Sequence, residues 1–210
     1  MRLRSSASFL TLLMGALPPC GSSFLSRVDS HIESPVGNRL SVREATVLDE
    51  PFFLNVRLDP AVLEMSREKT GPAFAHELRE QFKWIIKGGS ATDPDHRLFL
   101  HVVSLGAEGQ GPIRDVGLVQ GRIERDGPNG PTATIGFALA PEFWRRGLAV
   151  ESVRASLARL RDRYGVRTVV AYTYAMNAAS VQTLKRLGFQ PGPRMILTEP
   201  GFLHGLQLKL

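Results

Sequence analysis

Cysteine is almost absent from this chain of 210 residues, in which Cys20 is the only one. A single cysteine excludes an internal disulfide framework and a metal site built from cysteine thiolates. The five histidines include no pair at the spacing of metal ligands (His31, His76, His96, His101 and His204). We therefore predict that the protein holds no metal. His101 alternates within a strand-like run, and we expect it to be structural.

Runs of one charge sign and long apolar runs are also missing. The net charge is +6 and the isoelectric point is about 10.0, but the arginines are scattered and no basic stretch interleaves with aromatic residues. A nucleic-acid groove would show such a stretch, so we predict no nucleic-acid partner. Solubility explains the positive charge best, and a phosphorylated small molecule explains it as well as nucleic acid does. The apolar stretch 9–17 is too short to span a bilayer.

The first 38 residues differ from the rest of the sequence. They begin with Met1-Arg-Leu-Arg4, continue with the apolar stretch, and contain no acidic residue before Asp29. This pattern is typical of a secretory signal or a mitochondrial presequence, although Pro18-Pro19-Cys20 is a poor cleavage site. We expect 1–38 to be a leader or a poorly ordered extension, and 39–210 to be the folded domain. A cytoplasmic location is expected, or a mitochondrial or exported one if the leader is a targeting segment.

The folded part reads as one mixed α/β domain, because its 43% hydrophobic and 22% charged residues are typical of soluble globular proteins. Period-two patterns predict strands and period-3.6 patterns predict helices between Gly, Pro and Asn breaks. The expected order begins with a strand at 39–46, a short helix capped by Asp49 and a helix after Gly71-Pro72. Three strands follow, at 97–105, 116–123 and 133–140, and then a helix over 146–164 that Gly165 ends. The last elements are a strand at 168–174, a helix that is capped by Asn177 and stops at Gly188, and closing strands at 195–197 and 202–210.

Two segments carry the functional signal. In the first, Ile135–Glu151, a buried strand runs through a Pro-containing turn into a helix whose first turn contains Arg145-Arg146-Gly147. The start of a helix presents unpaired N–H groups at its positive end, which makes a ready site for phosphate. The second segment is Asn177-Ala-Ala-Ser180, followed by Leu184-Lys-Arg-Leu-Gly-Phe189.

Together, these segments resemble the GNAT superfamily of acetyl-CoA-dependent N-acetyltransferases. Within it, the chain is most similar to the branch that acetylates the N-terminal alanine or serine of ribosomal proteins. The first segment matches the pyrophosphate-binding motif Gln/Arg-x-x-Gly-x-Gly/Ala, with Trp144 at the opening position. The resemblance covers most of 39–210. It implies a central, mostly antiparallel sheet of six or seven strands with a V-shaped split, flanked by about four helices.

The resemblance also implies a site for acetyl-CoA, as co-substrate, between the strand that ends at Ala140 and the strand 169–174. Main-chain groups would pair with the pantetheine arm, and amides of the helix start would hold the pyrophosphate. The cofactor-binding residues expected in this way are Phe137, Ala138, Leu139, Arg145, Arg146, Gly147, Leu148, Ala149, Val150 and Asn177. Asn177 and Ser180 are the expected catalytic residues. Ser180 would donate a proton near the thioester sulfur, or else pack in the first turn of its helix.

Departures from the family leave the general base open. Many members have a tyrosine acid where this chain has Leu184, and a glutamate base where it has Thr134. The remaining candidates for a base or water relay are Glu151, Tyr172, Tyr174 and His204, and each also has a structural interpretation. We therefore expect catalysis to depend on positioning an amine that is already partly neutral.

Two functions remain open on this basis, beside a nucleic-acid-associated protein that would rest only on the isoelectric point. The first is an active N-acetyltransferase whose acceptor is a peptide N-terminus or a small-molecule amine. The second is a non-catalytic module that binds acyl-CoA as a sensor. Acceptor choice is expected to lie in the loop 59–71 and in the loop that joins the last two strands. The sequence leaves a homodimer open.

Overall fold

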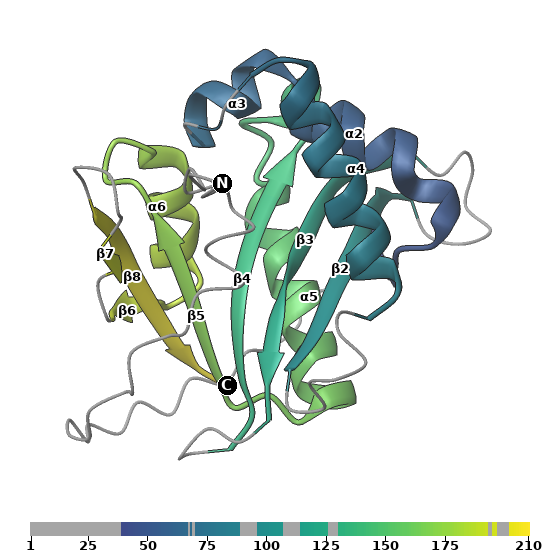
Figure 1. The fold of residues 1–210 in the computed structure, drawn as a ribbon. Helices are drawn as coiled ribbons and strands as arrows, with labels where there is room; N and C mark the ends of the chain where they lie inside the picture. Colours follow the sequence, from purple (N-terminus) through teal and green to yellow (C-terminus); the bar gives the residue numbers. More distant parts are fainter. Residues whose placement is uncertain are drawn as a thin grey trace, which may run out of the picture.

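A mixed β-sheet forms the centre of the protein. The computed structural model describes residues 39–66, 68, 70–88, 96–106, 114–125, 130–192, 195–196 and 202–210, so the predicted leader 1–38 lies outside the described residues. The strands follow the order β1-β2-β3-β4-β5-β8-β6, and β7 also pairs with β8 (Figure 1). Every neighbouring pair is antiparallel except β4 and β5, which are parallel. The strands are β1 (Leu40–Glu44), β2 (His96–Leu105), β3 (Arg114–Glu124), β4 (Thr132–Leu139), β5 (Thr168–Thr173), β6 (Gln190–Pro191), β7 (Met195–Ile196) and β8 (Phe202–Lys209).

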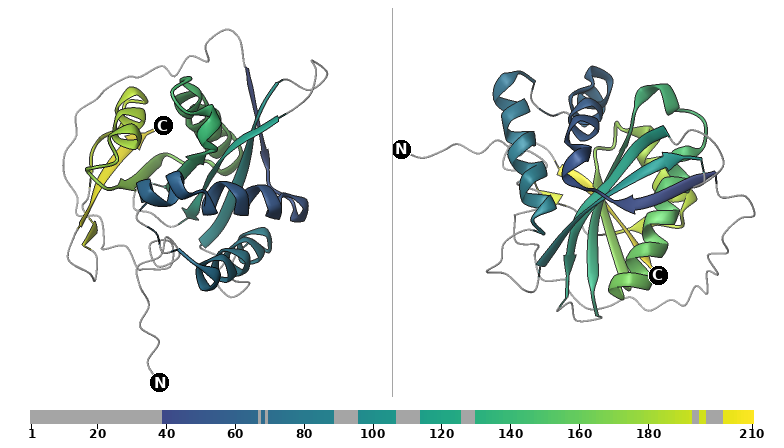
Figure 2. Two further views of the ribbon diagram at one scale, coloured as in Figure 1. Left: turned by 90° about the horizontal axis from the view of Figure 1, so that it is seen from above. Right: turned by 90° about the vertical axis from the view of Figure 1, so that its right-hand side faces the viewer.

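Helices cover both faces of the sheet. Helices α5 (Leu148–Tyr164) and α6 (Ala178–Arg186) lie on one face, and α2 (Glu50–Leu58) and α4 (Pro72–Ile86) lie on the other (Figure 2). Each long helix turns an apolar stripe towards the sheet, as its period predicts. Helix α4 buries Phe74, Leu78, Phe82 and Ile85, and α5 buries Val153, Leu157 and Leu160. None of the helices in the described ranges is long and apolar enough to cross a membrane.

The predicted mixed α/β fold and its mostly antiparallel sheet are confirmed, and seven strands lie along the main path. One additional helix appears among the described residues, which contain five α-helices where about four were expected. Helix α3 (Pro60–Ser66) occupies the segment 59–71 that we expected to be a loop. The amide of Ala61 donates to Asp59 Oδ1 at 2.9 Å, and Pro60 fills the first helical position. Asp-Pro is a helix-start signal, and the predicted loop is therefore wrong over 60–66.

Asp49 has a different role from the one predicted. It occupies the position before α2, but its side chain makes no cap hydrogen bond to that helix. Instead its carboxylate accepts hydrogen bonds from both terminal nitrogens of Arg43, at 2.7 and 2.8 Å, and from the amide of Thr46 at 2.7 Å. The Arg43 hydrogen bonds lower the pKa of Asp49. The carboxylate therefore fixes the end of β1 to the start of α2 and does not cap α2.

Candidate active site

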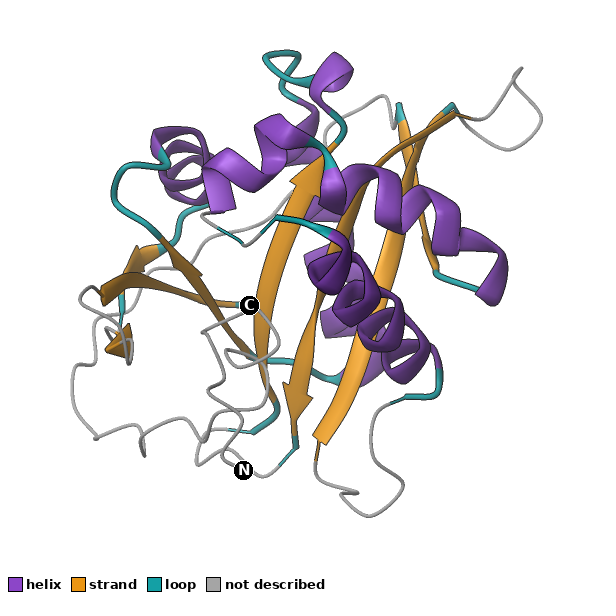
Figure 3. Cartoon of the chain, turned by 45° about the horizontal axis from the view of Figure 1, so that its top comes forward, coloured by secondary structure: helices purple, strands orange, loops and turns teal. Residues whose placement is uncertain are grey.

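The sheet divides between β4 and β5. Their parallel pairing begins at Thr132↔Thr168 and ends at Ile135↔Ala171. Beyond that rung β4 continues to Leu139 along β3, and β5 continues to Thr173 along β8. The two strands therefore diverge towards their carboxyl ends, which Figure 3 shows with the top of the molecule tilted forward (β4 and β5 are labelled in Figure 1). This divergence is the split that the family resemblance implied.

Backbone groups of β4 face the split at alternate residues. The amide of Ala140 donates to the Val116 carbonyl at 3.0 Å, so even-numbered residues of β4 direct their backbone groups towards β3. Odd-numbered residues face the other way, and Phe137 and Leu139 lie beyond the last rung with β5. The Leu139 carbonyl accepts a hydrogen bond from Trp144 Nε1 at 2.8 Å. Phe137 and the Leu139 amide therefore offer an unpaired strand edge, whereas Ala138 pairs with β3.

The turn after β4 leads into α5 through two left-handed residues. After the 3-10 turn Pro141–Phe143, Arg145 has φ 61° and Gly147 has φ 77°. Neither value is compatible with a helix, so α5 begins at Leu148 and not at Arg146 as predicted. Positive φ is costly at a non-glycine residue, so Arg145 marks a backbone conformation that its surroundings impose.

Five consecutive amides at this turn have no partner among the described residues. The N–H groups from Arg145 to Ala149 make no hydrogen bond to any described residue, and the first bond of the helix is from Val150 N–H to the Gly147 carbonyl at 3.2 Å. A Cβ added at Gly147 would meet no atom within 4 Å. The positive end of a helix of 17 residues thus faces open space, which suits a phosphate group.

The side chains around this helix start add positive charge. Arg145 and Arg146 are exposed, and neither forms an ion pair within the described ranges. Arg146 and Arg114 lie over the ring of the buried Phe143, 5.7 and 4.8 Å from its centroid. Phe143 and Trp144 are packing residues, as predicted. Trp144 also holds the turn through its hydrogen bond to the Leu139 carbonyl. Arg114 also forms an ion pair with Glu142 at 3.4 Å, so Arg145 and Arg146 are the cations that this corner offers to a ligand.

The opposite wall of the split leads into α6. Asn177 caps this helix, because its Oδ1 accepts from the Ser180 amide at 3.0 Å, and the predicted cap is confirmed. Its Nδ2 donates to the Met65 carbonyl of α3 at 3.4 Å, a contact that the sequence did not predict. The half-buried Ser180 hydroxyl has no hydrogen-bond partner among the described residues. Helices α6 and α5 pack against each other, so both motifs belong to one region.

The two residues that stand where many family members carry an acid and a base are both buried. Leu184 is fully buried in the core, and Thr134 is buried in β4. Glu151, the only carboxylate among the four candidate bases, forms an ion pair with Arg39. Tyr172 and Tyr174 are half-buried, and the His204 side chain lies outside the described part of the structure. Among the described residues, no group of three potential metal ligands occurs.

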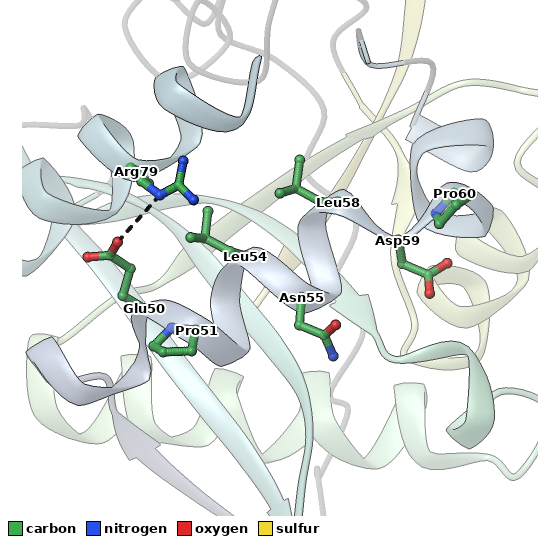
Figure 4. Close-up of a pocket in the computed structure, with 8 residues that line it drawn as sticks. All are labelled: Glu50, Pro51, Leu54, Asn55, Leu58, Asp59, Pro60 and Arg79. Atoms are coloured by element: carbon green, nitrogen blue, oxygen red, sulfur yellow. Dashed lines mark ion pairs between the residues drawn. The ribbon is translucent and has the colours of Figure 1, made fainter. Parts of the chain in front are cut away.

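A separate open groove of about 640 Å³ runs along α2 (Figure 4). It contains none of the residues around Gly147 or Asn177, so it does not coincide with the amide cluster. Its charged side chains include Glu50 and Arg79, which form an ion pair at 3.9 Å. At its other end lie Asp59 and Pro60, where α3 begins. The groove therefore borders the segment 59–71 in which we expected acceptor selection.

The comparisons with known proteins agree with this geometry. Residues 39–190 match the family model described as the acetyltransferase (GNAT) domain. Among solved structures, the chain is similar to a spermidine N-acetyltransferase from Vibrio cholerae in complex with CoA and spermine. The two share 17% identity and a TM-score of 0.61, covering 82% of this chain and 96% of that chain.

Two further structures have the same fold. RimL, a ribosomal L7/L12 α-N-protein acetyltransferase in complex with CoA, is 18% identical with a TM-score of 0.62, covering 84% of this chain and 97% of that one. The aminoglycoside acetyltransferase AAC(6')-Ib, in complex with CoA and kanamycin, is 14% identical with a TM-score of 0.60, covering 81% and 94%. At these identities the likeness concerns the fold.

Proposed function

This chain belongs to the GNAT family of acetyltransferases, and we propose that it transfers the acetyl group of acetyl-CoA to the primary amine of a peptide N-terminus or a small molecule. The observation that carries the proposal is the row of five amides, Arg145 to Ala149, which have no partner in the described part of the chain and lie beside the split between β4 and β5. A diphosphate and an extended amide-containing arm are the two ligand parts that such a pair of features suits.

The residues present fit acetyl-CoA as co-substrate. Amides from Arg145 to Ala149 would surround the pyrophosphate, whereas the Val150 amide, which was also predicted to bind it, already donates to the Gly147 carbonyl. The exposed guanidinium groups of Arg145 and Arg146 would add charge complementarity. The backbone of Phe137 and the Leu139 amide would pair with the pantetheine arm, as an added strand would. Asn177 would supply a further hydrogen bond from the α6 side. When bound, acetyl-CoA supplies a thioester, which is an activated acyl group.

Transfer requires few groups from the protein. The amine attacks the thioester carbonyl with its lone pair, a C–N bond forms, and the C–S bond breaks. The nitrogen loses a proton and the departing thiolate gains one. A thiol pKa of about 8.5 makes the thiolate a tolerable leaving group. Ser180, whose hydroxyl has no partner in the described part of the chain, is proposed as the proton donor to the sulfur.

A weakly basic acceptor suits this site. Glu151 is held by Arg39, and Thr134 and Leu184 replace the usual base and acid. An α-amino group has a pKa of about 7.7–8.0, against about 10.4 for an alkyl amine such as lysine, so more of it is neutral near pH 7. We therefore favour a peptide N-terminus. A rate that fell by several powers of ten on changing any one of Glu151, Tyr172, Tyr174 or His204 would contradict this view.

A sensor that binds acyl-CoA without turnover is the alternative, and the absent acid and base favour it. Incubation with acetyl-CoA and a panel of acceptors separates the two. The panel contains peptides with N-terminal alanine or serine, a polyamine and an aminoglycoside, and both thiol release and the mass of the acceptor are measured. Acetylated product supports the enzyme. CoA binding by calorimetry without product supports the sensor, and no binding rejects both.

Replacing Ser180 with alanine is expected to lower kcat about tenfold, because the thiolate then leaves without a nearby donor. The backbone amide of Ser180 remains, so its bond to Asn177 and the start of α6 are preserved. The KM for acetyl-CoA should therefore change little in steady-state assays. Thr183→Ala, which removes a half-buried hydroxyl one turn further along α6, is the matched control. Equal kcat in both variants would show that Ser180 only packs.

A further inference from the structure

Buried polar side chains line one face of the sheet next to the split. Gln120 and Arg122 of β3 and Thr134 of β4 are all buried. The register places Arg122 opposite Thr134, and Gln120 opposite Gly136. Residues directly opposite each other on antiparallel strands project to the same face. The row formed by Arg122, Thr134 and Gln120 therefore leads towards the place where β4 and β5 separate.

This row lies on the face covered by α2 and α4. His101 contacts Ser156 of α5, so His101 projects towards α5. The register places His101 opposite Val119, which assigns Val119 to the α5 face and its neighbour Gln120 to the other. Helix α2 contacts both β3 and β4 there, and Figure 2 shows the two helix layers on opposite sides of the sheet.

Gln120 lies beside the apex of the split. The last rung between β4 and β5 is Ile135↔Ala171, and Gly136 is the next residue of β4. Gly136 is only half-buried, and it has no side chain to separate Gln120 from the split. Neighbouring strands are about 5 Å apart, a distance that a glutamine side chain can span. The other cross-strand neighbour of Gln120 is Leu100, which has no hydrogen-bonding side chain.

Within the described ranges, the amide oxygen of Gln120 has no donor. Its side chain is 4% exposed, and Oε1 makes no hydrogen bond within the described residues. A buried acceptor without a donor destabilises a fold, and such atoms are rare in native proteins, so this one calls for an explanation. Arg122, further along the same face, has its own partner in Glu124, at 2.5 Å. A ligand that donates a hydrogen bond at the apex of the split would explain the Gln120 oxygen.

We propose that Gln120 Oε1 accepts a hydrogen bond from the acceptor amine and thereby orients the nitrogen lone pair towards the thioester carbonyl. This inference rests on the proposed function. A nucleophilic amine must keep its lone pair free, so only a hydrogen-bond acceptor can hold it by its N–H groups. A carboxylate would also accept, but it would favour the charged ammonium form. The neutral amide oxygen holds the amine without stabilising its protonated form.

The test replaces Gln120 with methionine, which has a similar length and no amide. With a peptide acceptor, kcat/KM is expected to fall about tenfold, chiefly through a higher acceptor KM. The affinity for CoA, measured by calorimetry, should not change, because Phe137, Leu139 and the helix start are intact. The melting temperature should stay the same or rise, because an unpartnered oxygen has been removed from the interior.

Two variants complete the design. Gln81→Met is the matched control. Gln81 of α4 is as buried as Gln120, and its Nε2 has no partner in the described part of the chain. The atom without a partner is here an amide nitrogen, which cannot accept a hydrogen bond from an amine. Gln81→Met should therefore leave kcat/KM unchanged. Gln120→Glu keeps an acceptor oxygen but favours the ammonium form, so its kcat/KM should be low near pH 7 and should return to within about threefold of the wild-type value at higher pH.

The possible failures differ from one another. If the wild-type protein transfers acetyl groups and Gln120→Met does so with the same acceptor KM and kcat, the role of Gln120 is wrong and the proposed function stands. If Gln120→Met melts earlier and binds CoA more weakly, Gln120 is a structural residue and the inference is likewise overturned. If the wild-type protein acetylates no amine, the proposed function fails and the inference fails with it.

Discussion

Replacing Gly147 with valine is expected to weaken CoA binding by about 100-fold. Five amides without a partner among the described residues lie at this turn, and nothing lies within 4 Å of where the Gly147 Cβ would be. The new side chain would therefore project into the space in front of them. That space is where we place the pyrophosphate. Losing two charge-assisted hydrogen bonds, at about 1.5 kcal/mol each, accounts for a change of this size. Calorimetric titration with CoA measures it.

Gly165→Val is the matched control for this variant. Gly165 ends the same helix with φ 66°, close to the φ of 77° at Gly147, and a Cβ there would also meet no atom within 4 Å. Both variants therefore place a β-branched residue in the left-handed region, at a cost of about 1–2 kcal/mol in stability. Only Gly147 adjoins the split. Equal loss of CoA affinity in the two variants, or none in either, would show that the amide cluster does not bind the cofactor.

The main elements could be predicted because glycine, proline and asparagine mark their ends. Gly165 and Gly188 follow α5 and α6 in the left-handed conformation that glycine favours, and Asn177 caps α6 through its side chain. The split was predicted only through the family resemblance. No local pattern shows that β5 pairs with β4 as far as Ala171 and then diverges, because such pairing depends on residues far apart in the sequence.

The features that the sequence did not predict arise from tertiary contacts. Arginine has no intrinsic preference for positive φ, so the late start of α5 could not be read from Arg145. The bond from Asn177 to the Met65 carbonyl requires α3 to approach α6 from far along the chain. Similarly, the position of Gln120 at the apex of the split follows from the register of three strands. Alternation within β3 shows only which residues share its face.

Acid is expected to destabilise the protein through His101, by about 3 kcal/mol between pH 6.5 and pH 4. Burial, followed by the nearby charge of Arg159, lowers the pKa of this imidazole from 6.5 to about 4, with Glu44 opposing and Arg163 assisting. Ser156 Oγ contacts Nδ1, whereas Nε2 is buried with no partner among the described residues. A second ring proton would therefore bring a charge into the core with one N–H unsatisfied.

The sign follows from proton uptake. Between pH 6.5 and 4 the unfolded chain binds a proton at residue 101 and the folded protein does not, so the free energy of unfolding falls as the pH falls. Above this window the contribution is complete. The lowered pKa values of Asp49 and Glu44 also make the free energy of unfolding fall as the pH falls. Their contribution is lost only below the ordinary pKa of a carboxyl group, and thus at lower pH than that of His101. Urea unfolding at pH near 7, about 5.5 and about 4.5 measures the slope.

His101→Gln removes the titrating ring from this interior. The variant is expected to be less stable at neutral pH, because the packing against Phe99, whose ring centroid is 5.0 Å from that of His101, is lost. Its free energy of unfolding should nevertheless vary little between pH 6.5 and 4.5. His76→Gln, a change at an exposed position on α4, should keep the wild-type slope. A His101→Gln protein with the full wild-type slope would assign the acid sensitivity to other groups.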